Sequence, residues 1–247
     1  MKTQAQTYYD AFSEGYDARR HQGYHAMLDE LESELVLRYC AGRHVLDAGC
    51  GTGLILDRVQ PEVRSVVGMD LSMGMLHKAR TRVAAATRGL VHGSLTDLPF
   101  GDDSFDAAFS FKVLAHVPDI KKALRELARV VRPGGHLILE FYNPLSVRGL
   151  LWKLKRPGLV AKGLDEGQVF TRFDRPGQAK SYLPKGWKIV DTRGIRIVTP
   201  AAKLMTIPQL GSFLHKAEHK LADSPARVFG SFYCLVAQRG SHKNCCE

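Results

Sequence analysis

The alternation of apolar and polar positions along the middle of the chain predicts an α/β fold. Apolar runs of strand length are separated by turn-rich or helix-like segments; the runs occupy residues 44–48, 63–69, 90–94, 105–111 and 136–141. Such alternation is typical of parallel strands joined by crossovers. We therefore expect a doubly wound sheet.

Two of the intervening segments carry helix signals. At residues 119–132 apolar positions recur every three or four residues, Asp119 can cap the start, and Pro133-Gly134-Gly135 can end the helix. Ser72 can cap a second helix, whose apolar stripe comprises Leu76, Ala79, Val83 and Ala86. Each helix has one apolar face and is expected to pack on the sheet.

The other segments are expected to complete one domain over residues 1–247. We expect a helical cover at 1–40, a binding core at 41–142, a basic insertion or lid at 143–183, two late strands and a helix at 184–238, and a mobile tail at 239–247. Residues 144–156 predict an amphipathic helix that either lids the site or lies on an anionic bilayer.

Composition limits the class of protein. The chain has 247 residues, 45% of them apolar and 24% charged, which excludes disordered and fibrous classes. It contains no apolar run of about 18 to 20 residues and no apolar signal region at its start, so we expect a cytoplasmic protein, with peripheral membrane contact left open. Five cysteines without a Cys-x-x-Cys pair favour neither a disulfide framework nor a cysteine zinc site. A net charge of +10 favours an anionic partner or surface.

A glycine-rich loop follows the first strand. Gly49, Gly51 and Gly53 alternate there, and glycine allows a ligand to approach the main chain closely. Asp70 ends the next strand, where a carboxylate can accept hydrogen bonds from both hydroxyls of a ribose. Asp97 follows the third strand at the same edge, and Leu54 occupies the position where a dinucleotide loop expects glycine or alanine. The pattern favours a ligand with ribose and adenine but no pyrophosphate, and disfavours a nicotinamide-dependent oxidoreductase.

Taken in order, these motifs resemble those of class I S-adenosylmethionine-dependent methyltransferases. The matching motifs are Asp47-x-Gly49-x-Gly51-x-Gly53, Asp70, Asp97, Phe105-Asp106 and Arg132-Pro133-Gly134-Gly135. The resemblance covers about residues 8–141 and is closest to the branch of ubiquinone and menaquinone biosynthesis and small-molecule methyltransferases, whose amino-terminal element is matched by Tyr9-Asp10 and Tyr16-Asp17. It implies a Rossmann-like seven-stranded sheet of order 3-2-1-4-5-7-6 with strand 7 antiparallel, and S-adenosylmethionine as cofactor.

The resemblance also implies where the cofactor binds. Gly49 and Gly51 would lie against its methionine part, Asp70 would hold the ribose, and Asp97 with the Leu98 amide would recognise adenine. Phe111 would offer its carbonyl to the methionine ammonium, and Asp47 would help through water. The complete expected set is Asp47, Gly49, Cys50, Gly51, Gly53, Asp70, Leu71, Met75, Asp97, Leu98 and Phe111.

The methyl acceptor is inferred from the residues after the fourth strand. In-line displacement at a sulfonium requires neither a metal nor a covalent residue. The stretch lacks the Asn/Asp-Pro-Pro-Tyr/Phe motif of adenine methylation and a cysteine nucleophile, and it has no glutamate before Glu126 to grip a guanidinium. Nucleic acid is disfavoured as a partner, and a small, apolar or aromatic metabolite methylated at O, N or C is expected. RNA or lipid methylation and silent cofactor binding remain alternatives.

Several side chains have two interpretations. His116 either acts as a general base or packs at a helix start. The resemblance implies that Tyr16 lies beside the sulfonium, whereas Tyr8 and Phe12 are expected to pack. Arg172 either reaches an anionic substrate group or lies in solvent. His215 and His219 have i, i+4 spacing without an H-E-x-x-H motif or a third ligand nearby in sequence, so a solvated helix face is favoured and no metal is expected.

Overall fold

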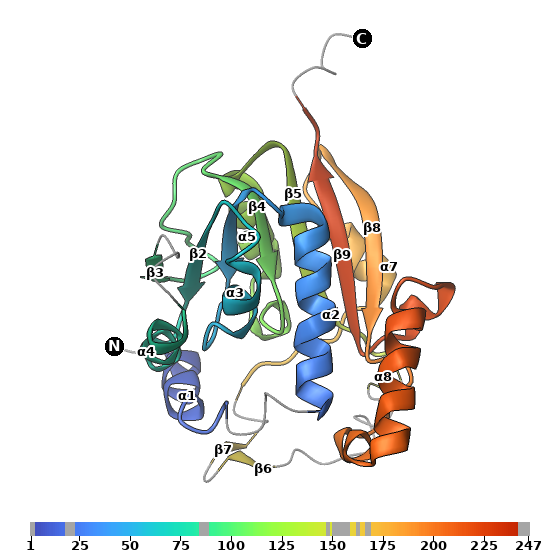
Figure 1. Ribbon diagram of the computed structural model, residues 1–247. Coiled ribbons are helices and arrows are strands. Elements are labelled where there is room, and N and C mark those ends of the chain that lie inside the picture. Colours follow the sequence, from blue (N-terminus) through green and yellow to red (C-terminus); the bar gives the residue numbers. More distant parts are fainter. Residues whose placement is uncertain are drawn as a thin grey trace.

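The structure is a computed structural model that describes residues 3–17, 23–83, 89–146, 149, 159–161, 164–165 and 169–241. Its centre is a seven-stranded sheet of order β3-β2-β1-β4-β5-β9-β8 (Figure 1). Strands β1 to β5 pair in parallel, and β9 is antiparallel to both β5 and β8. The strands are β1 His44–Ala48, β2 Ser65–Asp70, β3 Gly89–His92, β4 Phe105–Ser110, β5 Val131–Tyr142, β8 Trp187–Ile195 and β9 Phe232–Arg239. The predicted sheet, including its order and its antiparallel seventh strand, is confirmed.

Helices surround this sheet. The α-helices are α1 Gln4–Phe12, α2 Gly23–Cys40, α3 Leu54–Val59, α4 Met73–Arg82, α5 Ile120–Val130, α7 Pro176–Ser181 and α8 Pro208–Ala222. Short 3-10 helices are η1 Leu114–His116, η3 Ala202–Thr206 and η4 Pro225–Phe229, and β6 Leu159–Ala161 pairs with β7 Leu164–Asp165 outside the main sheet. The predicted caps are confirmed, because Asp119 Oδ1 accepts from the Lys122 N–H at 3.0 Å and Ser72 Oγ accepts from the Met75 N–H at 3.2 Å.

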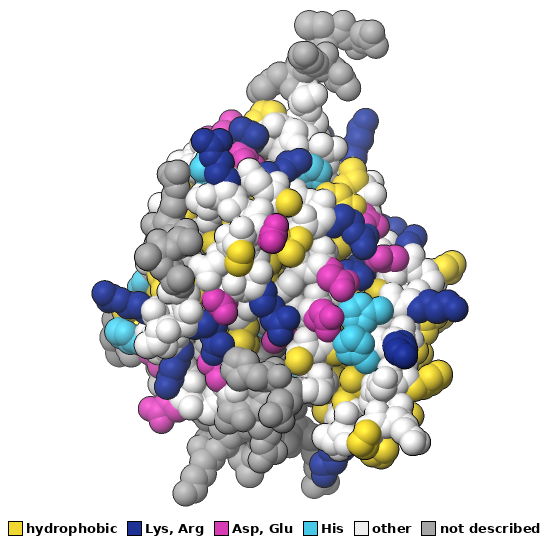
Figure 2. Space-filling view, in the orientation of Figure 1, with side chains coloured by type: hydrophobic (Ala, Val, Ile, Leu, Met, Phe, Trp, Pro, Cys, Tyr) yellow, Lys and Arg dark blue, Asp and Glu magenta, His cyan; other side chains and the backbone are white. Residues whose placement is uncertain are grey.

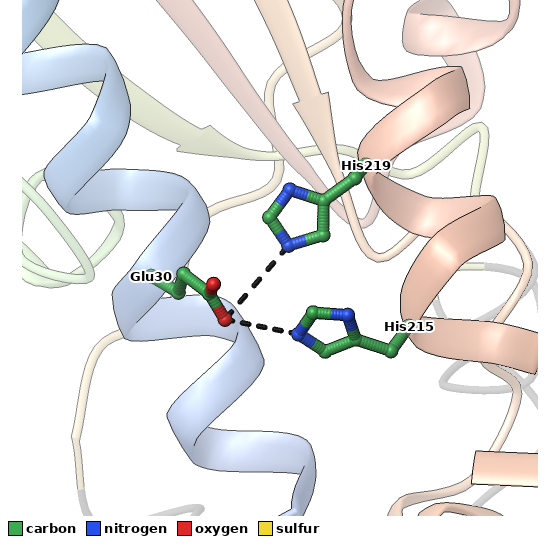
Figure 3. Close-up of side chains that lie close together, drawn as sticks. All are labelled: Glu30, His215 and His219. Atoms are coloured by element: carbon green, nitrogen blue, oxygen red, sulfur yellow. Dashed lines mark hydrogen bonds and ion pairs between the residues drawn. The ribbon is translucent and has the colours of Figure 1, made fainter. Parts of the chain in front are cut away.

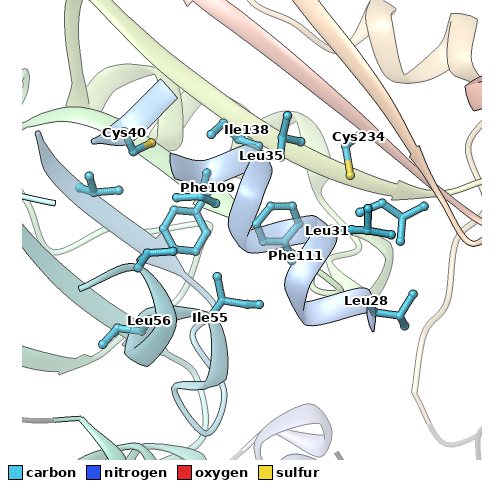
Figure 4. Packing of buried hydrophobic residues seen from close by; sticks show 14 of the residues in the cluster. Leu28, Leu31, Leu35, Cys40, Ile55, Leu56, Phe109, Phe111, Ile138 and Cys234 are labelled. Carbon is cyan, nitrogen blue, oxygen red and sulfur yellow. The ribbon is translucent and has the colours of Figure 1, made fainter. Parts of the chain in front are cut away.

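Two buried layers follow from the period-2 geometry of the strands, whose side chains alternate between the faces of the sheet. Helices α2 and α3 cover one face, where Leu31 and Leu35 pack with Ile55, Phe109 and Ile138 (Figure 4). Helix α5 covers the other face through buried residues that include Leu124 and Leu127. The carboxyl ends of β1, β2 and β4 are thereby held at one edge of the sheet.

The structure differs from the sequence-based prediction at the start of β5. The segment 133–135 was expected to separate helix from strand, whereas β5 begins at Val131, directly after α5. The register of β5 against β4 shifts between the pairs Phe105–Val131 and Ala107–His136, so residues 132–135 form an irregularity in β5. This irregularity accommodates Pro133, which has no N–H to donate.

Other predicted elements lie partly outside the described residues. Helix α4 ends at Arg82, and Ala86 is outside the described part of the chain. The same holds for most of the amphipathic segment 144–156 and for 242–247 in the tail. Among the helices that are described, none has the length and apolar character needed to cross a membrane.

Candidate active site

A cavity of about 560 Å³ lies where the glycine loop, the ends of the strands and α1 meet. The wall formed by the edge of the sheet comprises Gly49, Gly51, Asp70, Leu71, Met75, Ser94, Leu95, Thr96 and Phe111. A smaller cavity of about 50 Å³ shares Tyr16, Gly49, Gly51, Phe111 and Lys112 with it. The two cavities therefore form one site at the carboxyl edge of the sheet, the usual place for ligands in α/β sheets.

The three glycines of the loop have different surroundings, and open space for a ligand lies at Gly51. Gly49 has φ +93°, and a Cβ there would overlap the Val113 side chain. Gly51 has φ +54°, and no atom lies within 4 Å of an added Cβ, so its main chain faces open space. Gly53, at φ 79°, is the N-cap of α3 and packs against Ala79, which gives it a structural role.

Asp70 fixes the loops on either side of it. Its Oδ2 accepts from the Gly51 N–H at 2.8 Å, and its Oδ1 accepts from the Ser72 N–H at 2.8 Å. Burial raises the pKa of this carboxyl, and the donated backbone N–H groups oppose that rise. Each carboxylate oxygen retains a second acceptor site, so Asp70 can also hold a pair of hydroxyl groups in the cavity.

The two residues expected to recognise adenine, Asp97 and Leu98, are not among those that line the cavity. The Asp97 side chain is exposed, and the Leu98 N–H donates to Glu126 Oε2 at 3.0 Å. The chain turns sharply after β3, where Ser94 and Asp97 form an isolated bridge. Ser94, Leu95 and Thr96 line the cavity in their place, and their position directly after the third strand was the signal that the sequence analysis passed over.

A buried charged cluster forms the wall of the small cavity. Lys112 Nζ donates to Glu32 Oε2 at 2.7 Å and to Asp29 Oδ1 at 3.5 Å. Asp47 also lines this cavity, and burial, followed by the charges of Asp70 and Glu32, raises its pKa well above the ordinary value. Burial likewise raises the pKa of the Cys50 thiol there. The cluster is rich in carboxylates, which suits a cationic group of a ligand.

Asp29 and Glu32 were missed by the sequence analysis. They occupy positions i and i+3 within the apolar stripe of α2, and both are fully buried, at 1% and 0% exposure. Two acidic residues on the apolar face of a helix are a signal of a polar site, because an isolated charge is rarely buried.

In the two Tyr-Asp pairs, the aspartates and the tyrosines have different roles. Asp10 Oδ1 accepts from Ser72 Oγ at 2.6 Å and from the Gly74 N–H at 3.0 Å, which ties α1 to the start of α4. Asp17 accepts from Thr52 Oγ1 at 2.8 Å and pairs with Arg82 at 2.5 Å. The preceding tyrosines, at positions 9 and 16, line the cavity. The aspartates thus hold α1 over the site while the tyrosines close it.

His116 lines the large cavity, as the glycine loop does. Its Nδ1 is 3.0 Å from the Phe170 carbonyl and 3.3 Å from Thr171 Oγ1. A carbonyl can only accept, so Nδ1 carries the proton in this contact and Nε2 is the basic nitrogen. The ring also makes edge contacts with Tyr9 and Tyr142, at centroid distances of 6.2 and 5.5 Å.

Aromatic and apolar side chains form the rest of that wall. They are Tyr8, Tyr9, Phe12, Tyr16, Val113, Val117, Pro118, Tyr142, Val169 and Phe173. Tyr8 and Phe12 stack at 5.7 Å, as expected for packing, but both also face the cavity. Burial, and then the neighbouring Tyr142, raises the pKa of Tyr9, which keeps its phenol neutral.

Both interpretations of Arg172 are wrong. Its guanidinium donates to Asp174 at 2.9 Å and to the carbonyls of Val117 and Leu114 at 3.1 and 3.0 Å. These contacts hold the segment after residue 169 against η1, so Arg172 positions the wall that carries His116 and is neither solvated nor directed at a substrate.

Comparisons with known proteins agree with this geometry. A family model described as a methyltransferase domain matches residues 46–139. A demethylmenaquinone methyltransferase of Listeria monocytogenes is 38% identical over 176 residues, which cover 66% of this chain and 67% of that protein. The chain belongs to the class I S-adenosylmethionine-dependent methyltransferases. A demethylmenaquinone methyltransferase of Clavibacter sepedonicus is 42% identical over 127 residues, 49% of this chain and 52% of that protein.

Solved structures support the methyltransferase fold over nearly the whole chain. A SAM-dependent methyltransferase from Thermotoga maritima superposes with a TM-score of 0.68 at 18% identity, covering 94% of this chain and 99% of that one. In sequence, the chain spans about half the length of the first relatives that it matches, with 52% and 47% of their lengths covered.

The family's cofactor is S-adenosylmethionine, and the residues present fit it. The open space at Gly51 accommodates a ligand against the main chain, and Asp70 retains acceptor capacity for two hydroxyls. The acidic small cavity suits the ammonium group of the methionine part.

Proposed function

We propose that this chain transfers a methyl group from S-adenosylmethionine to a small aromatic acceptor of the quinol or phenol type. The observation that carries the proposal is the aromatic wall of the cavity that the glycine loop also lines, in which His116 supplies an imidazole. The names of the relatives, demethylmenaquinone methyltransferases, support a quinone-type acceptor. The volume of about 560 Å³ falls within the range of about 300 to 1,000 Å³ typical of small-molecule sites.

We assign the cofactor end of the cavity to the residues at the edge of the sheet. Gly49, Gly51, Asp70, Leu71 and Met75 would bind the ribose and the adjoining part of the cofactor. Ser94, Leu95 and Thr96 replace Asp97 and Leu98 as the candidates for the adenine end. Phe111, Asp47 and Cys50, which line the small cavity, are assigned to the methionine end.

On the acceptor side, the sulfonium supplies an activated methyl group. The protein would orient the acceptor, exclude water and supply a base. His116 Nε2 would accept the hydroxyl proton of a quinol, and the Phe170 carbonyl would hold the ring by its Nδ1–H. Tyr16, which lines both cavities, would lie between the two ligands, where its ring favours a cation.

The proposal covers the chain as one domain, with α1 as the lid. It also includes peripheral contact with an anionic membrane through 144–156, supported by the net charge of +10 and by the apolar character of quinols. Co-sedimentation tests this contact: we expect binding to anionic vesicles at low salt, release at high salt, and no binding to neutral vesicles. Failure to pellet with anionic vesicles at low salt would reject the membrane contact. Residues 144–156 would then be assigned to the cover of the site.

Release of S-adenosylhomocysteine tests the proposed chemistry. The enzyme is incubated with S-adenosylmethionine and, separately, with benzoquinols and naphthoquinols, catechols, amines, fatty acids and RNA. We expect turnover with the aromatic hydroxyl compounds and none with RNA. Turnover with RNA or lipid alone would reject the quinol-type acceptor but keep the methyltransferase assignment, whereas cofactor binding without turnover on any class would identify a silent binder.

A further inference from the structure

Two histidines and two glutamates face each other between α2 and α8, on the side of the molecule away from α1. His215 and His219 lie one turn apart on α8, and Glu30 and Glu34 lie one turn apart on α2. Figure 3 shows the two imidazoles converging on the Glu30 carboxylate, and Figure 2 shows histidine side chains beside acidic ones on this face. Glu30 is 185 residues away from His215 in the chain, so a third ligand near the histidine pair in sequence was not to be found.

Three ligand atoms converge at one point. Glu30 Oε2 lies 2.9 Å from His215 Nε2 and 3.9 Å from His219 Nε2, and all three atoms lie within 4.8 Å of one another. Metal–nitrogen bonds of about 2.0–2.1 Å separate the ligands of a tetrahedral ion by about 3.4 Å. Small side-chain rotations suffice to reach that separation.

The His219 ring is oriented by a carboxylate on its far side. Glu34 Oε1 lies 3.4 Å from Nδ1, while the Nε2 atom is buried and, among the residues that the structure describes, has no hydrogen-bond partner. A carboxylate behind one ring nitrogen and a metal on the other is a common arrangement for a ligating histidine. Glu34 is neutralised by Arg193 at 2.9 Å, so it serves this orienting role and Glu30 remains the ligand.

Both helices are rigidly held. On α8, Glu218 accepts the N–H groups of Ile197, Val198 and Thr199 at 2.8 to 2.9 Å, and α2 is anchored by Leu28 and Leu31 in the core. The ligand side chains are nevertheless open to water, with 39% exposure for His215, 25% for His219 and 44% for Glu30. An ion can therefore enter from the side of His215 and Glu30, the more exposed ligands, and water can complete its coordination there.

We propose that Glu30, His215 and His219 form a binding site for a divalent transition metal of the zinc class that joins α2 to α8. Two imidazoles and one carboxylate favour zinc over magnesium or calcium, which prefer oxygen ligands. The ion closes a long loop of the chain. It also fixes the helix that carries Asp29 and Glu32 of the small cavity, so its effect is on stability and on the rigidity of that wall.

The test is zinc titration of the full chain, with any purification tag removed, in competition with a chromophoric chelator. Because Cys245, Cys246 and His242 in the tail can bind zinc by themselves, every measurement uses the Cys245→Ser/Cys246→Ser background. The other three cysteines are buried. The variants are His215→Ala, His219→Ala and Glu30→Gln, and the control is His77→Ala, which removes an exposed histidine from α4.

We expect one zinc ion per chain and a zinc-dependent rise in Tm, with no rise on adding magnesium. Each histidine variant should weaken zinc binding at least about tenfold and abolish the rise in Tm, because ligand loss exceeds the tenfold to hundredfold cost of losing an outer partner. His77→Ala should bind as the parent does. A thermal unfolding transition measured without metal checks that each variant is folded. Absence of zinc binding in the parent background, or equal binding in a His215→Ala/His219→Ala protein, would overturn the proposal.

Discussion

Replacing Asp70 with alanine should weaken the binding of S-adenosylmethionine by about 3 kcal/mol. The two carboxylate oxygens each receive one backbone N–H, from Gly51 and Ser72, and each would receive one ribose hydroxyl. A hydrogen bond to a charged group contributes about 1.5–3 kcal/mol, and the lower value applies because the released hydroxyls can turn to water. Two such bonds give about 3 kcal/mol, or roughly a 150-fold rise in Kd.

Titration calorimetry measures this directly, and Asp97→Ala is the matched control. Asp97 is exposed and is not among the residues that line the cavity, so its replacement should leave Kd within about threefold. Asp70→Ala also leaves two backbone N–H groups without their acceptor, so unfolding without ligand must show that the variant is folded at the titration temperature. Near-normal binding by Asp70→Ala would refute the assignment of the ribose, and a large loss in Asp97→Ala would refute the assignment of adenine to the turn at 94–96.

Three further outcomes follow from the site. His116→Ala should lower kcat about 100-fold with an unchanged Kd for the cofactor. Thr171→Val should lower kcat only slightly, because the Phe170 carbonyl still accepts from the His116 ring. Equal losses of kcat in the two variants, measured in steady-state assays, would contradict the assignment of His116 as the base. Asp10→Ala should raise the KM of both ligands by loosening α1, while exposed Glu14→Ala should not, and unchanged KM values for Asp10→Ala would contradict the role of α1 as a lid. Burial raises the pKa of Asp47, so the stability of the parent protein should fall as pH rises through that pKa. Asp47→Asn should remove this loss: the variant should be more stable than the parent at about pH 8 but not at about pH 4, and it should bind the cofactor more weakly. Equal Tm values of variant and parent at about pH 8 would contradict this expectation.

The sheet could be predicted from the sequence because its signals are local. The strand at residues 44–48 has the same bounds in the structure, and the caps at Ser72 and Asp119 depend on residues three positions apart. The start of β5 was mispredicted because a proline and two glycines ordinarily end regular structure, whereas here a register shift against β4 absorbs them.

The site was predictable from spacing where its residues follow strands directly. Asp70 and Gly51 belong to this group, and their hydrogen bond joins two such loops. The spacing of Asp97 after the third strand does not indicate the tight turn at 94–97, which brings Ser94, Leu95 and Thr96 to the cavity wall. The partners of Lys112 and of His215 lie on α2, far away in sequence, so only the packing of that helix brings them together.

The measurement that tests the central claim most directly is a single-turnover reaction with S-adenosylmethionine carrying a deuterated methyl group and an excess of a demethylated naphthoquinol. Mass spectrometry follows the acceptor, and chromatography follows S-adenosylhomocysteine. We predict equal amounts of S-adenosylhomocysteine and of acceptor carrying one deuterated methyl group, with both lost in His116→Ala on the same timescale. Bound cofactor with neither product, for this acceptor and for the other aromatic hydroxyl compounds, would contradict the account.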